Sequence, residues 1–372
     1  MFVILSWIIL VLVAGLRYET GGDWSIYGHI FEKINPIKEV LSGSGFGFNR
    51  EMGFVFLCSL IKQFGGTLQT VFFLVTLLNL SLITYSLKIY TKYIIVGLLV
   101  YYCMLYFSLE MIFIRQSTAV AFCFFAMKYV KQNNFWKYLL FVFIASLFHR
   151  TSLLMIPLYW IFKYRMNNIV ITIVILLGGV VMFFNIPWLK GVLLLVSNFL
   201  GPEFGNRAIY YTSESRFSVS REISVGFLLN LFILAAVLWR RPQIEKTEHG
   251  NTFINMYVVS LMIYYYGYEF FEINSRFRLS YLISVIVLFP LLLESFKFMI
   301  LRIFSFVSLV VYCFIFSQAI FLERPPAIPY NPYQNYLIYK WFNKKSTGLE
   351  RAKEGDKQFS KQREEMRKRQ EK

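Results

Sequence analysis

Long apolar runs recur along almost the entire chain, and this feature constrains the fold more than any other. In lipid a helix satisfies its own backbone, and a spanning helix needs about 20 apolar residues. The sequence therefore predicts an all-α fold, a polytopic membrane helix bundle of about 11 transmembrane helices, within a range of roughly 10 to 12. The expected spans are 2–16, 67–87, 93–110, 112–130, 135–149, 151–163, 168–187, 223–239, 253–271, 279–296 and 298–320.

Composition agrees with a membrane location and excludes an ordinary soluble enzyme. Only 16% of the residues are charged, whereas soluble proteins carry about 25%. The chain is 57% hydrophobic, with a formal net charge of +17. In a soluble protein this charge would suggest nucleic acid. Here the basic residues lie mostly in loops and in the tail, so we expect membrane lipid and lipid-linked phosphate as partners, and no nucleic acid.

Two shorter runs and two long polar loops complete the expected membrane domain, residues 1–340. The runs 53–64 and 188–200 are too short to span alone and favour re-entrant or interfacial helices. The loops 17–50 and 201–222 are expected outside the cytoplasm. The first of them is rich in glycine and aromatic residues, which is typical of a loop that covers a substrate.

The charged tail, residues 344–372, holds eleven Lys or Arg residues and six Asp or Glu residues. With almost no apolar residues, it is predicted to be disordered or a frayed helix, and a chain lacking 346–372 is expected to stay functional. Basic, acid-poor short loops indicate the cytoplasmic side. These loops contain Lys88 and Lys92; Lys128, Lys131 and Lys137; Lys163 and Arg165; Arg240, Arg241 and Lys246; Lys297 and Arg302. An odd span count would place the tail on the opposite side, and the sequence leaves this open.

Two basic clusters at the edges of apolar runs are the main functional signal. Arg115 and Gln116 precede a small residue, Ala119, and His149 adjoins Arg150. Such groups are costly at a membrane margin unless something holds them. On neighbouring helices at one membrane face they suit a pocket for an anionic, phosphate-bearing substrate. The imidazole of His149 can accept a proton and is a candidate base.

Other polar residues allow both a structural and a functional interpretation. Asp23 could cap a helix over 24–34 or act as a base, and Glu51 has the same ambiguity at the start of its helix. Arg276 and Arg278, at the outer end of the 279–296 run, could extend a phosphate clamp or simply mark the interface.

Several kinds of site have no support in the sequence. The four cysteines (Cys58, Cys103, Cys123, Cys313) lie in apolar stretches without a CxxC pair, so zinc and disulfides are not indicated. Walker A, GxGxxG, HExxH and GxSxG motifs are absent from the sequence. We therefore expect no cofactor and no metal.

Several motifs, taken in order, resemble the EpsG family of exopolysaccharide polymerases, which is grouped with the Wzy-type O-antigen and capsule polymerases. They are Arg17…Gly21-x-Asp23…Tyr27, Glu51-x-Gly53-Phe54, Ile114-Arg115-Gln116-x-x-Ala119, Phe148-His149-x-x-Ser152 with Pro157, Arg276-Phe277 with Tyr281 and Pro290, and Asn331-Pro332-Tyr333. The resemblance covers about residues 1–340. The chain departs from the pattern at Met52, where the family often has proline, and at Arg150-Thr151.

The resemblance implies a metal-independent enzyme of the bacterial inner (plasma) membrane whose active site faces the periplasm or exterior. Such an enzyme joins oligosaccharide repeat units carried on undecaprenyl pyrophosphate, and a flippase and a chain-length regulator are implied partners. Arginines would neutralise the departing pyrophosphate, and His149, Asp23 or Glu51 would act as base. Arg17, Tyr27, Arg115, Gln116, Arg150, Arg276, Arg278 and Tyr333 would bind substrate.

Two other classes of function stay open. A transporter of lipid-linked oligosaccharides would be expected to show internal repeats, and none is visible in the sequence. A multi-pass acyltransferase would take its acyl donor from the cytoplasm, so the side of the membrane on which His149 lies distinguishes it from a polymerase.

Overall fold

The computed structural model describes residues 1–372 except 36, 38–50, 193–194, 196–224, 322–327 and 371–372. Within the described residues every regular element is a helix, which confirms the predicted all-α class. The predicted loop 201–222 and most of the glycine-rich part of loop 17–50 lie outside the described residues.

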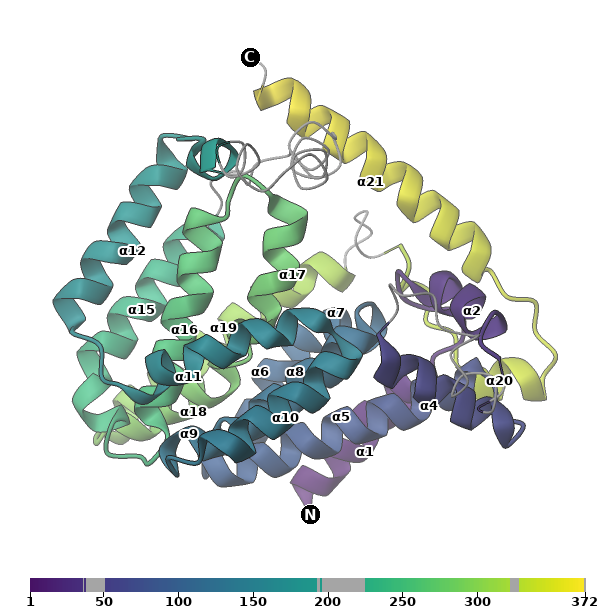
Figure 1. Ribbon diagram of the computed structural model, residues 1–372, viewed down its shortest axis with the longest axis horizontal. Coiled ribbons are helices and arrows are strands. Elements are labelled where there is room, and N and C mark those ends of the chain that lie inside the picture. Colours follow the sequence, from purple (N-terminus) through teal and green to yellow (C-terminus); the bar gives the residue numbers. More distant parts are fainter. Residues whose placement is uncertain (36, 38–50, 193–194, 196–224, 322–327, 371–372) are drawn as a thin grey trace. The chain divides into compact units, whose positions relative to one another are not determined.

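The described residues form two compact units. Residues 1–160 and 289–358 make the first, and 161–288 and 359–372 the second. In the first, α1 (Phe2–Gly15), α5 (Leu68–Tyr90), α8 (Ile114–Ala126) and α10 (Phe135–Phe148) pack side by side (Figure 1).

The remaining helices of the first unit are shorter or more peripheral. They are α2 (Trp24–Glu32), α4 (Met52–Gln63), α6 (Ile94–Tyr101), the π-helix η1 (Tyr102–Tyr106), α7 (Phe107–Met111), α9 (Lys128–Lys131), the 3-10 helix η2 (Arg150–Leu154), α19 (Met299–Phe321) and α20 (Tyr336–Trp341). The second unit contains α12 (Asn168–Phe183), α15 (Val225–Ile244), α16 (Gly250–Tyr266) and α17 (Phe271–Leu282). The residues of α11 (Met155–Lys163), α18 (Val285–Ser295) and α21 (Gly348–Gln370) are divided between the units.

Fewer helices can cross a bilayer than the apolar runs predict. In the described part of the chain, three helical stretches are long and apolar enough to cross: Leu68–Tyr90, Ile94–Met111 and Gly226–Ile244. The second of them consists of α6, η1 and α7 in succession. A bent pair raises the number to four. The expected spans 2–16 and 135–149 are helices of 14 residues each, about 21 Å long at 1.5 Å per residue. The predicted count of about 11 is therefore not confirmed.

Two expected spans are interrupted where the sequence suggested continuous or kinked helices. The run 151–163 starts with the 3-10 helix η2, and Pro157 falls in the first turn of α11, where its missing N–H costs nothing. The run 279–296 divides into α17 and α18, which are bent by 45°. Arg276 and Arg278 therefore belong to α17 and do not precede a single helix over 279–296.

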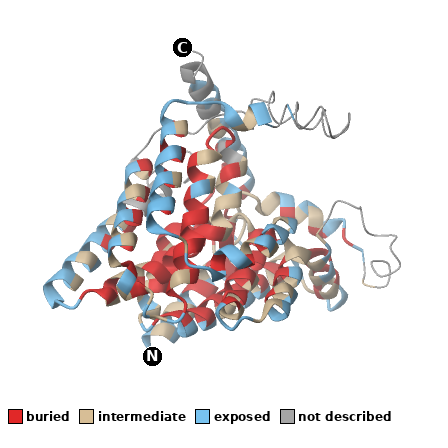
Figure 2. Cartoon of the chain, turned by 60° about the vertical axis from the view of Figure 1, so that its left-hand side comes forward, coloured by how far each residue is buried: buried red, intermediate tan, exposed pale blue. Residues whose placement is uncertain are grey.

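Several helices carry exposed residues along part of their length (Figure 2), and many of these residues have large apolar side chains. On α12, Ile169, Ile173 and Leu176 are exposed, whereas Ile171 and Ile175 are buried. A helix that is apolar on its exposed face as well as its buried face suits contact with lipid rather than water. This pattern agrees with a membrane protein.

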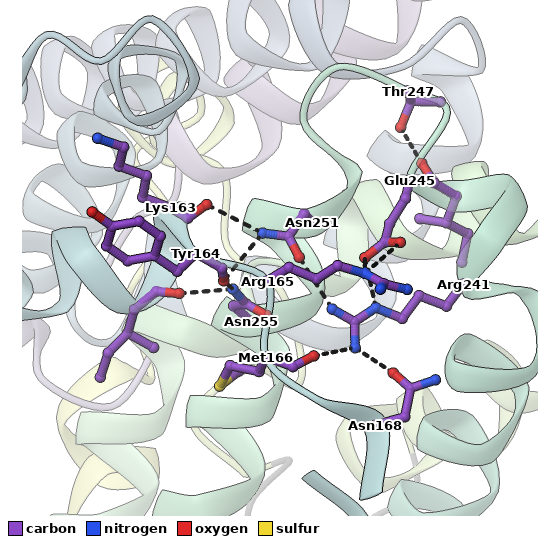
Figure 3. Close-up of polar contacts among 12 residues, drawn as sticks. Lys163, Tyr164, Arg165, Met166, Asn168, Arg241, Glu245, Thr247, Asn251 and Asn255 are labelled. Carbon is purple, nitrogen blue, oxygen red and sulfur yellow. Dashed lines mark hydrogen bonds and ion pairs between the residues drawn. The ribbon is translucent and has the colours of Figure 1, made fainter. Parts of the chain in front are cut away.

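A buried arginine in the last turn of α15 contacts the segment that leads into α12 (Figure 3). Arg241 Nε donates to Glu245 at 2.7 Å, and its Nη1 donates to the carbonyl of Met166 at 2.8 Å and to the side chain of Asn168. Arg165, from the same loop as Met166, donates to both oxygens of Glu245 at 3.0 Å. The basic segments 163–165 and 240–246, which the sequence assigned to one side, therefore lie together.

Most of the described part of the charged tail is a helix. α21 covers Gly348–Gln370, and its first turn is anchored, because the side chain of Arg351 is buried. This burial gives the start of the tail a structural role that its composition did not suggest.

Candidate functional site

Three helix ends meet in the first unit, and each contributes one predicted site residue. Glu51 is the N-cap residue of α4, Arg115 lies in the first turn of α8, and His149 is the C-cap residue of α10. Because α10 packs against both α4 and α8, these residues meet although Glu51 and His149 are 98 positions apart.

The carboxylate of Glu51 joins the other two side chains. Its Oε1 lies 2.8 Å from Nδ1 of His149, and its Oε2 accepts a hydrogen bond from Nη1 of Arg115. The side chain of Glu51 is only 11% exposed, so both charge-assisted contacts form in a partly dry environment that strengthens them. We call Glu51, Arg115 and His149 the Glu51 cluster. The carboxylate makes no capping bond to α4, so it serves the cluster instead.

The contact with Glu51 fixes the tautomer of His149. An ionised carboxylate can only accept hydrogen bonds, so Nδ1 must carry the proton and donate it. Nε2 is then the basic nitrogen, and among the described residues it has no hydrogen-bond partner. With its side chain 27% exposed, His149 can receive a proton from an approaching hydroxyl group.

Arg115 combines a fixed position with partial exposure. A cation at a helix N-terminus is unfavourable next to the helix dipole, and the contact with Glu51 offsets this cost. The guanidinium Cζ lies 5.7 Å from the ring centroid of Tyr27, at cation–π distance. Because 35% of the side chain is exposed, Arg115 can still approach an anionic group from solution.

Tyr27 provides the apolar support for the cluster. Its ring is buried and contacts Phe54 and Phe72 at centroid distances of 5.6 and 6.4 Å. Burial raises the pKa of Tyr27; Arg115 acts against this rise and Asp23 adds to it. The phenol therefore stays neutral at physiological pH, and its ring face is available to the guanidinium.

The close approach of α4 and α10 depends on Gly53. A Cβ atom at this position would lie 2.9 Å from the Cβ of Leu147 and 3.0 Å from its carbonyl oxygen. Only glycine lets the backbones come this close without a shift. The spacing brings the N-cap of α4 to the C-cap of α10, which is where Glu51 meets His149.

The other predicted residues of these segments differ in exposure and in position relative to the cluster. Arg150 is exposed at the start of η2, directly after His149. Gln116 and Ala119 are buried, so of the predicted polar notch on α8 only Arg115 is accessible. Asp23 occupies the N-cap position of α2, as expected, but its side chain makes no capping hydrogen bond.

Arg17 and Tyr333 lie at the junction of the N-terminal and C-terminal segments. Arg17 is completely buried, stacks 4.1 Å from the ring centroid of Phe72, and donates from Nη1 to the carbonyl of Ala14 at 2.9 Å. Burial lowers its pKa to about 10, so the group remains a cation near pH 7. The hydroxyl of Tyr333 donates to the carbonyl of Val13 at 2.7 Å.

Arg276 and Arg278 belong to the second unit, where both lie on α17. Arg278 donates to Asn230 at 2.9 Å and lies 4.5 Å from the ring centroid of Tyr264. Arg276 is exposed. Neither arginine belongs to the Glu51 cluster, which consists of residues of the first unit alone.

A buried carboxylate that the sequence analysis missed lies just before Arg115 in the chain. Glu110 is fully buried and accepts hydrogen bonds from the hydroxyls of Tyr101 and Ser117 at 2.6 and 2.8 Å. The amide of Asn79 donates to its other oxygen at 3.2 Å. This network ties α5 and α7 to α8, the helix that carries Arg115. A lone acid in the apolar run 93–110 was the signal that could have revealed it.

The cluster offers a base, a carboxylate that orients the base, and a cation. This set can remove a proton from a hydroxyl group and stabilise a departing phosphate. In the part of the chain that the structure describes, no three His, Cys, Asp or Glu side chains gather as they would around a metal ion.

Comparison with known proteins identifies the family. The family model of the EpsG family matches residues 1–335, so the chain belongs to this family. No curated protein and no solved structure matches the chain. Family membership and the apolar helices together indicate a membrane protein with a role in exopolysaccharide polymerisation.

Proposed function

We propose that this EpsG-family protein joins oligosaccharide repeat units carried on undecaprenyl pyrophosphate, and that the Glu51 cluster is the reaction site. The observation that carries the proposal is the single carboxylate that pairs with both His149 and Arg115. A transfer from a pyrophosphate donor to a sugar hydroxyl needs a base near the acceptor and a cation near the leaving group, and the cluster holds both in a fixed relation.

His149 acts on the acceptor in this mechanism. Its Nε2 takes the proton from the attacking hydroxyl at the non-reducing end of the acceptor unit, while Glu51 holds the imidazole and stabilises the imidazolium that forms. The hydroxyl oxygen forms the new glycosidic bond to the anomeric carbon of the growing chain. The imidazolium later releases its proton to solvent.

Arg115 acts on the leaving group. The bond between the anomeric carbon and the pyrophosphate oxygen breaks, and the electron pair leaves with undecaprenyl pyrophosphate. Arg115 neutralises the charge that develops there, and the exposed Arg150 lies next to His149 for a second contact. Arg17 is fully buried and so does not contact the phosphate directly; in this mechanism it supports the structure around the cluster.

The reaction is placed on the extracytoplasmic face of the inner or plasma membrane. This placement rests on the basic, acid-poor loops assigned to the cytoplasm, which leave residues 115 and 149 on the opposite side. A flippase would deliver the lipid-linked units to this face, and a chain-length regulator would act on the product.

The test is a deletion strain complemented with cluster variants. Arg115→Ala and His149→Ala, expressed at normal levels, should fail to restore polymer, and lipid-linked single repeat units should accumulate on the outer face. Lys131→Ala, which removes an exposed cation of the first unit, is the matched control and should restore polymer.

The same experiment separates the alternatives. A transporter would leave single units on the cytoplasmic face when it is lost. An acyltransferase would leave polymer of normal length that lacks acyl groups. Either result would contradict the proposal.

A further inference from the structure

Two segments from opposite ends of the chain pair along their backbones in the first unit. Tyr18 N donates to the carbonyl of Gln334 at 2.8 Å, and Tyr336 N donates to the carbonyl of Leu16 at 2.7 Å. Gly21 N donates to the carbonyl of Pro329 at 3.0 Å. Residues 16–21 are thus held against 329–336, at the end of the stretch that the family model covers.

Arg351, beyond that stretch, binds both segments at once. Its Nη1 donates to the carbonyls of Pro329 and Pro332 at 3.2 and 2.8 Å. Its Nη2 donates to the carbonyl of Glu19 at 3.0 Å. The side chain is 8% exposed, and a buried cation of this kind is stabilised only by the acceptors around it. Removing it would deprive the carbonyl groups of Pro329, Pro332 and Glu19 of this donor.

Two neighbours of Arg351 strengthen the same contact. Ser346 Oγ donates to the carboxylate of Glu19 and lies 2.8 Å from the amide of Gln334. Gly348 packs so closely on Glu19 that a Cβ atom would collide with the Glu19 side chain and backbone. The tail therefore touches segment 17–21 through a polar side chain, a buried cation and a glycine.

Segment 17–21 leads directly to the Glu51 cluster. Gly21, in a left-handed conformation with φ of 101°, packs on the backbone of Met111, and Gly22 packs on Ile112. Met111 and Ile112 lie just before α8, whose first turn carries Arg115. On the other side, the segment continues into α2, which carries Tyr27 beneath the guanidinium of Arg115.

We propose that Ser346, Gly348 and Arg351 form a C-terminal clamp that holds segment 17–21, and that Arg351 is a positioning residue for the Glu51 cluster. The inference deepens the proposed function and, for its effect on activity, rests on it. It replaces the expectation that residues 346–372 are dispensable. Only the tail residues up to 358, the last one assigned to the first unit, should be needed for activity.

The first test measures the clamp without any activity assay. Thr20 is completely buried beside Arg351, so a Thr20→Cys reporter in detergent-solubilised protein should react slowly with a maleimide. The four native cysteines are buried, and the parent chain gives the background. Arg351→Ala should raise the labelling rate by about tenfold, because local opening exposes the reporter.

Matched variants make this result specific. Lys353→Ala removes an exposed cation from the same helix and should leave the rate unchanged. Gly348→Val should raise it as Arg351→Ala does, and Arg351→Lys should give an intermediate rate, since an ammonium reaches fewer carbonyls. If Thr20→Cys does not accumulate, the buried Gln334 serves as the reporter position. Equal rates in Arg351→Ala and Lys353→Ala would overturn the clamp.

The second test asks whether the clamp positions the cluster. In reconstituted protein, Arg351→Ala and deletion of 346–372 should lower kcat for chain extension by about tenfold or more with a smaller change in KM. Arg351→Lys should rescue part of the loss, and deletion of 359–372 should cost nothing. Faster labelling with normal kcat would overturn the positioning role. If the unaltered chain does not polymerise, the proposed function fails, while the labelling result still decides the clamp.

Discussion

At the scale of single residues, Glu51 has two tasks that one neutral side chain cannot perform. It fixes the tautomer of His149 and it holds the cation of Arg115 beside the base. The sequence did not decide whether Glu51 caps its helix or acts as a base, because an acid at the start of a helix is compatible with either role. The structure favours a third role, in which the carboxylate orients both partners.

Glu51→Gln should therefore lower the rate of polymer formation by about two to three decades. An amide keeps the shape of the side chain but loses the charge, and it can no longer accept strongly from both His149 and Arg115. The measurement is the rate of chain extension at saturating substrate. Glu32→Gln, at a site where the carboxylate is 77% exposed, should change nothing. A normal rate in Glu51→Gln would show that the cluster does not do chemistry.

The residue scale also shows where sequence reasoning ends. Arg115 and His149 could be singled out because cations at the edges of apolar runs are costly. Glu51 was also named, as a helix cap or a base, but its place as their common partner could not be predicted, because contact over 98 positions depends on tertiary packing. Glu110 was missed for the same reason: the sequence shows an acid in an apolar run, but not the three donors that stabilise it.

At the scale of helices, the site depends on how closely α4 approaches α10. Gly53→Ala should push these helices apart by a few tenths of an ångström, because the added methyl group meets the backbone of Leu147. The Glu51–His149 hydrogen bond should lengthen, and polymer formation should fall by about tenfold. Gly28→Ala is the control, since a Cβ there meets only Leu68, at 3.9 Å. Equal activity of the two variants would contradict this role for Gly53.

The positions of these helices were predicted better than the number of helices that can span a bilayer. The runs 67–87 and 93–110 became long helices, as expected. The runs 2–16 and 135–149 are also helices, with bounds within one residue of the predicted ones, but at 14 residues each they are shorter than the roughly 20 residues that a span needs. The break at Ile283 and Ser284 carries no proline or glycine, so nothing local marked it.

At the scale of the molecule, the first unit relates the tail to the candidate site. The contacts of Arg351 with Glu19 put the start of α21 beside segment 17–21, which packs next to α8 and the Glu51 cluster. The sequence left open which side of the membrane the tail occupies. Within the first unit, the start of α21 and the Glu51 cluster should therefore lie on the same side of the membrane.

Cysteine labelling in intact cells and in inverted vesicles tests this relation. Lys353→Cys and Arg150→Cys, both at exposed positions, should react with a membrane-impermeant maleimide from the same side, and the proposed function predicts the outer side. A position in the 163–165 loop should react from the opposite side if that loop is cytoplasmic. Labelling of positions 150 and 353 from different sides would contradict the arrangement of the first unit.

Whether the Glu51 cluster carries out glycosyl transfer is decided by chain extension with purified protein and a lipid-linked repeat unit in liposomes. Each bond formed should release one undecaprenyl pyrophosphate. Arg115→Ala should extend chains about two to three decades more slowly, a loss of roughly 3–4 kcal/mol of transition-state stabilisation. Arg115→Lys should recover only part of the rate, because an ammonium cannot reproduce the planar fork. Normal extension by well-folded Arg115→Ala would contradict the account.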